Sequence, residues 1–144
     1  MKAYVMPAIV STSIKVLIVE ERDLLREKIA GILSREENIS MVIQLSSYSR
    51  LQTAVGETGP DLVLGDLLEL KKFCEKTGIS ADELCPGVNI LLYTDECEKL
   101  HRIEADHPGG QRIFNVRRIQ QEVRSFLQDA NQRNQNNNIN KGID

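Results

Sequence analysis

Acidic and hydroxyl side chains stand at the ends of three apolar runs in this sequence. Glu20 and Glu21 follow the first run, Asp66 ends another, and Thr94 with Asp95 ends a later one. Carboxylate oxygens can coordinate a hard divalent cation or attack an electrophile as nucleophiles. A single acid in such a place more often caps a helix or is simply solvated. The chemistry available to these residues therefore depends on whether the fold brings them together.

The elements that would position these residues alternate along the chain. Short apolar runs, rich in β-branched residues, indicate strands that are buried on both faces. They cover residues 14–20, 41–45, 61–66, 88–94 and 111–116. Segments with helical spacing of apolar residues lie between them, over 21–38, 47–59, 67–76 and 95–105, with a short helical turn opened by the capping box Ser80–Glu83. The last helix has the clearest apolar stripe, from Ile119 to Ala130.

Five strand–helix units in a row predict an α/β fold with a parallel sheet and helices on both of its faces. Right-handed crossovers limit the topology to a doubly wound sheet, in which sites lie at the carboxyl ends of the strands. The domain is expected to span residues 14–130. Residues 1–13 would form a leader or an extra edge strand, and the Asn-rich residues 131–144 would form a disordered tail.

Composition excludes several classes of function. The net charge of −3 over 144 residues leaves no electrostatic footprint for nucleic acid. No apolar run approaches the roughly 20 residues that span a bilayer. Three cysteines without a CxxC pair are typical of reduced thiols in a cytoplasmic protein.

Three segments resemble response-regulator receiver domains of two-component signalling, and they occur in the family's order. The segment VLIVEERDLLREKIAGIL resembles the opening of these domains, in which an acidic pair ends the first strand. GPDLVLGDL resembles their third strand, which ends on the phosphoacceptor aspartate, and LLYT resembles their fourth. The resemblance covers roughly residues 14–130 and implies a flavodoxin-like, three-layer α/β/α fold with strand order 2-1-3-4-5.

The resemblance also implies roles for the residues at the strand ends. Asp66 would be the phosphoacceptor, and Thr94 would hydrogen-bond a phosphoryl oxygen. Glu20, Glu21 and Asp66 would form a site for Mg²⁺, which prefers oxygen ligands. The implied partner is a histidine kinase or another signalling protein of a phosphorelay. A homodimer through the last helix is a further expectation. No enzymatic activity is expected beyond phosphorylation and dephosphorylation of Asp66 itself.

Several departures from the family's pattern indicate an atypical member, or pseudo-receiver. Glu21 stands where the family usually has Asp, and Asp95 follows Thr94 in place of a small residue. No lysine occurs between Lys99 and Lys141, so Phe114 or Asn115 takes the place of the lysine that contacts the phosphoryl group. The Met-Pro that usually follows the phosphoacceptor is also absent. We therefore expect a module that acts through protein–protein contacts, with weak or no phosphorylation at Asp66.

Two alternatives stay open at this point. The first is a functional, Mg²⁺-dependent phosphoacceptor receiver that a histidine kinase switches. The second is an unrelated flavodoxin-like enzyme or ligand-binding domain, which a well-formed apolar pocket at the strand ends would favour.

Overall fold

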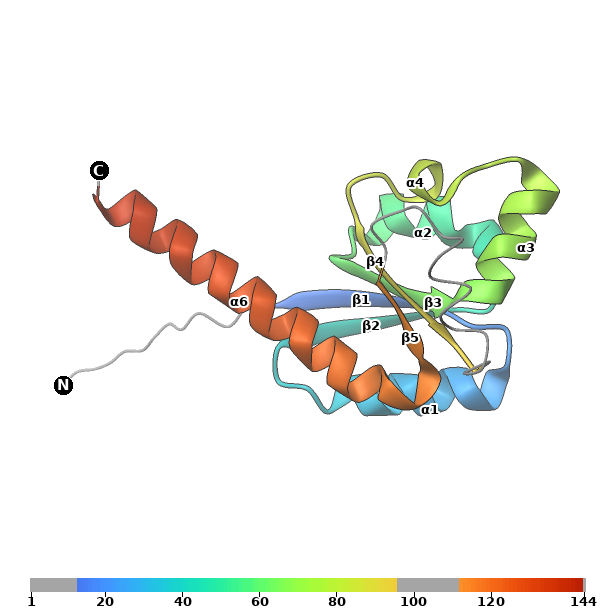
Figure 1. Cartoon of the computed structure of the whole chain (residues 1–144), viewed down its shortest axis with the longest axis horizontal. Coiled ribbons are helices and arrows are strands. Elements are labelled where there is room, and N and C mark those ends of the chain that lie inside the picture. Colours follow the sequence, from blue (N-terminus) through green and yellow to red (C-terminus); the bar gives the residue numbers. More distant parts are fainter. Residues whose placement is uncertain (1–12, 96–111, 144) are drawn as a thin grey trace.

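The structure is a computed structural model that describes residues 13–95 and 112–143 (Figure 1). Its sheet contains five parallel strands in the order β2-β1-β3-β4-β5. The strands are β1 (Ile14–Val19), β2 (Ile39–Leu45), β3 (Leu62–Asp66), β4 (Asn89–Thr94) and β5 (Arg112–Asn115). This order confirms the predicted doubly wound, flavodoxin-like fold. Apart from Ser13 and Asp95, the predicted leader 1–13 and the predicted helix 95–105 lie outside the described residues.

Helices cover both faces of the sheet, as Figure 1 shows. One face packs against α1 (Asp23–Ser34) and α6 (Ile119–Ile143). The other packs against α2 (Leu51–Thr58), α3 (Leu67–Thr77) and α4 (Ala81–Leu84). Two single-turn 3₁₀ helices, η1 (Tyr48–Arg50) and η3 (Val116–Arg118), precede α2 and α6.

The alternation of side chains along the central strands creates two cores. Ile18 and Leu64 point toward α1 and α6, whereas Leu17 and Val63 point toward α2, α3 and α4. Because successive side chains of a strand face opposite sides, a strand with both sides covered must be apolar throughout. That requirement explains the unbroken apolar runs of β1 and β3 and the abrupt change to polar residues where they end.

The helix ends follow local rules that were readable in the sequence. The side chain of Ser47 accepts a hydrogen bond from Ser49 N at the start of η1. Ser80 and Glu83 form the predicted capping box of α4. Gly59 and Gly78 end α2 and α3 with φ values of 59° and 75°, which favour glycine.

Helix α6 differs from the expectation for the end of the chain. Its first half carries the predicted apolar stripe, with Ile119, Val123 and Leu127 buried. The backbone then stays helical to Ile143, through the Asn-rich segment for which composition predicts disorder. Extending a helix costs far less than nucleating one, so the packed half supports the part that projects beyond the sheet in Figure 1. The domain limits of 14 and 130 stay a prediction.

No helix in the described ranges combines the length and the apolar character needed to cross a membrane.

Candidate functional site

The register of the strands places several polar residues at the same edge of the sheet. Val19 pairs with Gly65, so Glu20 lies level with Asp66. Asp66 in turn pairs with Tyr93 of β4. Thr94 lies one residue beyond Tyr93, next to Asn115 of β5. Strand pairing thus gathers side chains from distant parts of the sequence around the carboxyl ends of β1, β3 and β4.

Three of the four site residues predicted from the sequence are buried there. Glu20, Asp66 and Thr94 are 1%, 6% and 0% exposed, and they are the buried polar residues of the described chain. Glu21, the fourth, is exposed to solvent. The acidic pair expected at the end of β1 therefore divides into one buried and one exposed carboxylate.

The carboxylate of Glu20 is bound on both of its oxygens. Oε2 accepts from the Arg22 backbone N at 2.8 Å and from Arg22 Nε at 3.0 Å. Oε1 accepts from Arg22 Nη2 at 3.1 Å and from the Tyr93 hydroxyl at 2.7 Å. A two-nitrogen fork on a carboxylate is the strongest geometry that arginine offers. The negative charge of Glu20 is thereby compensated within the domain.

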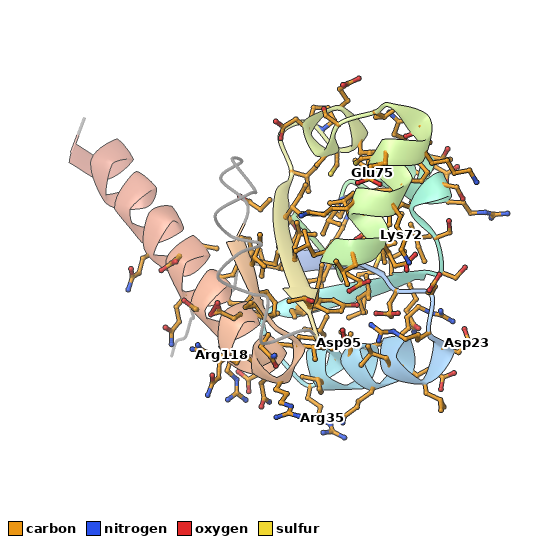
Figure 2. All side chains as sticks on the ribbon, turned by 45° about the vertical axis from the view of Figure 1, so that its right-hand side comes forward. Asp23, Arg35, Lys72, Glu75, Asp95 and Arg118 are labelled. Atoms are coloured by element: carbon orange, nitrogen blue, oxygen red, sulfur yellow. The ribbon has the colours of Figure 1, made fainter. Side chains whose placement is uncertain are left out.

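Arg22 also extends away from Glu20 to a second carboxylate. Its Nη1 lies 2.9 Å from Oδ2 of Asp95, the residue that follows β4. Figure 2 shows Asp95 just beyond the sheet, on the side that α1 covers. Arg26 of α1 adds a hydrogen bond from Nη1 to the Glu20 carbonyl oxygen, at 2.8 Å. These contacts fix the start of α1 to the ends of β1 and β4.

Opposing influences set the ionisation of Glu20. Burial, the largest of them, would raise its pKa, but the hydrogen bonds and charge of Arg22 and the hydroxyl of Tyr93 outweigh it. The pKa of Glu20 is therefore lowered, and the side chain is a carboxylate at neutral pH. Burial and the bond to Glu20 raise the pKa of Tyr93, so this residue stays a neutral donor.

Asp66 has a different environment. Its side-chain Oδ2 accepts from Glu69 N at 3.2 Å and caps α3. Its backbone oxygen accepts from the hydroxyl of Tyr48 at 2.9 Å. Burial raises the pKa of Asp66 to about 6; the Glu69 N–H and the charge of Arg22 oppose this shift, and the charge of Glu20 adds to it. Asp66 is thus a carboxylate at neutral pH but a poorly stabilised one.

Thr94 and Asn115 occupy the far side of the cluster. Thr94 is fully buried at the end of β4, beside Asn115. Asn115 is therefore the β5 residue at the level where the family's lysine was expected. Its Oδ1 accepts from Arg117 N and caps η3. The roles predicted for Thr94 and Asp66 in phosphoryl chemistry stay predictions.

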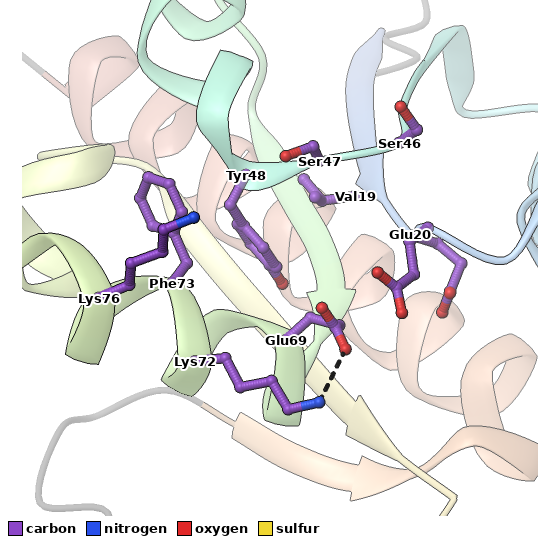
Figure 3. Close-up of a pocket in the computed structure, with 10 residues that line it drawn as sticks. Val19, Glu20, Ser46, Ser47, Tyr48, Glu69, Lys72, Phe73 and Lys76 are labelled. Carbon is purple, nitrogen blue, oxygen red and sulfur yellow. Dashed lines mark ion pairs between the residues drawn. The ribbon is translucent and has the colours of Figure 1, made fainter.

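A cavity of about 200 Å³ opens beside this cluster, between α3 and the ends of β1 and β2 (Figure 3). Tyr48, Phe73 and Val19 form its apolar part. Two serines and five charged side chains line the rest, and among the charged ones Nζ of Lys72 and Oε1 of Glu69 lie 3.5 Å apart. Ligand pockets are commonly about 300–1,000 Å³ and mainly apolar. This cavity is smaller, and half of its ten lining residues are charged, so it does not favour the interpretation of the chain as a ligand-binding domain.

Sequence reasoning missed Arg22, Tyr93 and Tyr48. Arg22 was one charge among many in a predicted helix, and only its spacing of two residues from Glu20 signalled a local pair. Tyr93 belongs to an apolar run and Tyr48 to the start of a predicted helix, and their hydroxyls bind partners 73 and 18 residues away. No local pattern specifies contacts of that range.

The predicted Mg²⁺ ligands do not fit a metal ion as they are arranged here. Mg²⁺ requires oxygen ligands at about 2.0–2.1 Å in an octahedron. Both oxygens of Glu20 already accept hydrogen bonds, and the positive charge of Arg22 lies against them. Among the described residues no group of three potential ligands is placed to hold a metal.

Comparison with known proteins gives a clear result for structure only. No family model matches the sequence, and no curated protein sequence matches it significantly. Among solved structures, the response regulator domain of Thermotoga maritima CheB is similar with a TM-score of 0.57 and 17% identity, over 82% of this chain and 96% of that one.

Two further structures of signalling proteins give similar values. A response regulator receiver modulated diguanylate cyclase from Pelobacter carbinolicus has a TM-score of 0.57 and 19% identity, over 84% of this chain and 97% of that one. The RcsB response regulator of Salmonella typhimurium has a TM-score of 0.54 and 14% identity over 79% of this chain, which spans only 57% of the RcsB chain. The described chain thus has the fold of response-regulator receiver domains.

Proposed function

We propose that this chain is a receiver-like signalling module of a two-component phosphorelay, which acts through protein–protein contacts with weak or no phosphorylation at Asp66. One observation carries the proposal: the buried acid beside Asp66 is already neutralised inside the domain. Arg22 and Tyr93 take both oxygens of Glu20, which a Mg²⁺-dependent reaction would need for the metal.

The surroundings of Asp66 support the same conclusion. A phosphoryl group on its carboxylate would need cations or donors to offset the added charge. The β5 position expected to supply a lysine carries Asn115, whose side-chain oxygen caps η3. Asp66 itself contributes to structure, because its side chain caps α3.

Phosphorylation can be tested directly. The purified chain is incubated with acetyl phosphate and Mg²⁺, and its intact mass is measured beside a receiver domain known to accept phosphate. We expect no phosphoryl adduct on this chain under conditions that label the reference. In parallel, the same protein partners should be retained by the wild type and by Asp66→Asn, since the contacts do not depend on modification.

A functional phosphoacceptor remains the second candidate, because Asp66 lies at the carboxyl end of the central strand next to Glu20 and pairs with Tyr93, the neighbour of Thr94. Stoichiometric labelling that disappears in Asp66→Asn would establish this candidate and overturn the proposal. Labelling that persists in Asp66→Asn would locate the modification elsewhere.

A further inference from the structure

Arg22 connects two carboxylates that belong to different parts of the fold. Each nitrogen of its guanidinium group has one partner: Nε and Nη2 bind Glu20, and Nη1 binds Asp95. Glu20 follows β1 and Asp95 follows β4, with β3 and Asp66 between them in the sheet. The guanidinium group therefore lies across the acidic end of the sheet.

The burial of the three side chains shows that Glu20 is the one that depends on the ion pair with Arg22. The Glu20 side chain is 0% exposed, whereas those of Arg22 and Asp95 are 45% and 51% exposed. A carboxylate removed from water is strongly disfavoured unless a positive charge and hydrogen bonds compensate it. This fold thus requires a cation against Glu20, and the chain supplies it from a residue two positions away.

We propose that Arg22 is an intramolecular substitute for a divalent cation: it occupies the acidic end of the sheet permanently and excludes Mg²⁺ from it. The inference rests on the proposed function and extends it by naming the residue that makes the site independent of metal. It also gives Asp95 a role. The sequence identified Asp95 only as a departure from the small residue usual after the threonine, whereas the structure makes it the second partner of the guanidinium group.

A divalent ion could not join this arrangement without breaking it. To coordinate Glu20 at metal–oxygen distances, it would displace the Arg22 fork and the Tyr93 hydroxyl. It would also lie next to the positive charge of Arg22, which like-charge repulsion opposes. The remaining acids offer little compensation, since Glu21 is exposed and Asp66 caps α3.

The test uses Mn²⁺ as a paramagnetic probe on the full chain. Amide signals near Asp66 are followed by NMR as Mn²⁺ is added to the wild type and to Arg22→Gln, which keeps amide donors but removes the charge. We expect no saturable broadening in the wild type and binding at least tenfold tighter in Arg22→Gln. The gain should disappear in the double variant Glu20→Gln with Arg22→Gln.

Arg35 provides a matched control, because it is exposed and lies at the other end of α1 from Asp23 (Figure 2). Arg35→Gln removes the same charge and should behave as the wild type does. Saturable Mn²⁺ binding to the wild type with affinity similar to that of Arg22→Gln would overturn the inference. If Arg22→Gln fails to fold, saturable Mn²⁺ broadening near Asp66 in the wild type alone still overturns the inference.

The two proposals fail in different ways. If acetyl phosphate labels Asp66 while Mn²⁺ stays excluded from the wild type, the proposed function is wrong and the role of Arg22 stands. If Mn²⁺ binds the wild type beside Asp66 but no labelling occurs, Arg22 does not replace the cation and the module is still unphosphorylated.

Discussion

The hydroxyl of Tyr93 donates a 2.7 Å hydrogen bond to Oε1 of Glu20 across the end of β3. Tyr93 is on β4 and Glu20 follows β1, and β3 lies between these strands in the sheet. Both side chains are buried. This bond and the Arg22 fork hold the three central strands together at the end where Asp66 lies.

The bond from Tyr93 should therefore contribute measurably to stability. Tyr93→Phe leaves the ring in place but removes a donor to a buried charge, and we expect a loss of about 1.5–3 kcal/mol in the free energy of unfolding. Tyr48→Phe is the matched control, because the Tyr48 hydroxyl binds the neutral carbonyl of Asp66 and should contribute only about 0.5–1.5 kcal/mol. Urea unfolding of both variants measures the difference. Equal losses would mean that the charge on Glu20 does not strengthen the Tyr93 bond.

Substitutions at Gly65 and Tyr48 should have strongly non-additive effects on the free energy of unfolding. A Cβ atom on Gly65 would overlap the Tyr48 hydroxyl oxygen and lie 3.1 Å from Cζ of the same ring. We expect Gly65→Ala to cost about 3 kcal/mol, as overpacking of a core does. In a Tyr48→Phe background the same change should cost at least about 1 kcal/mol less, because the overlapping oxygen is gone. Equal costs in the two backgrounds, measured by urea unfolding, would show that the ring moves aside freely.

Replacement of Asp66 should stabilise the domain at neutral pH. The folded state raises the pKa of Asp66 from 3.8 to about 6, so the folded chain holds this proton more tightly than the unfolded chain. Stability from this group is present below pH 3.8 and is lost as the pH rises through 6. We expect Asp66→Asn, which retains a good N-cap, to gain about 1–2 kcal/mol at pH 7.5, after allowance for solvent screening.

The gain should shrink between pH 6 and pH 4, as urea unfolding at several pH values would show. A gain that does not change with pH would assign the effect to side-chain packing instead of charge.

Glu20 should produce the opposite pH dependence. Its folded pKa is lowered from 4.5, so its contribution is present above pH 4.5 and is lost as the pH falls through the folded value. In an Asp66→Asn background, which removes the competing titration, we expect stability to fall on acidification below about pH 4.5. Glu20→Gln in that background should reduce the dependence of the free energy of unfolding on pH. An unchanged pH dependence would show that other carboxylates cause the acid sensitivity.

The strands were predictable from the sequence because burial on both faces leaves a simple signal, whereas their order was implied by the resemblance to receiver domains. Runs such as those ending at Glu20, Asp66 and Thr94 change from apolar to polar where the sheet ends. The parallel topology then places those ends at one edge. That logic predicts the positions of Glu20, Asp66 and Thr94 at one edge of the sheet.

The partners of these residues were not predictable in the same way. The sequence treated Glu20 and Glu21 as an equivalent pair, but Glu20 is buried against Arg22 and Tyr93, whereas Glu21 is exposed. The contact of Tyr93 with Glu20 depends on strand register across three strands, which a residue pattern does not encode. Asp95 could be judged only once Arg22 was seen beside it.

The length of α6 has a mechanical consequence. Leu127 is its last buried apolar residue among the described side chains, and the 16 residues from 128 to 143 continue as helix. At 1.5 Å per residue this segment is about 24 Å long. A rotation of about 10° at the point where α6 packs on the sheet would displace the tip of this segment by about 4 Å. A small repacking between α1 and α6 would thus become a large movement far from the acidic end of the sheet.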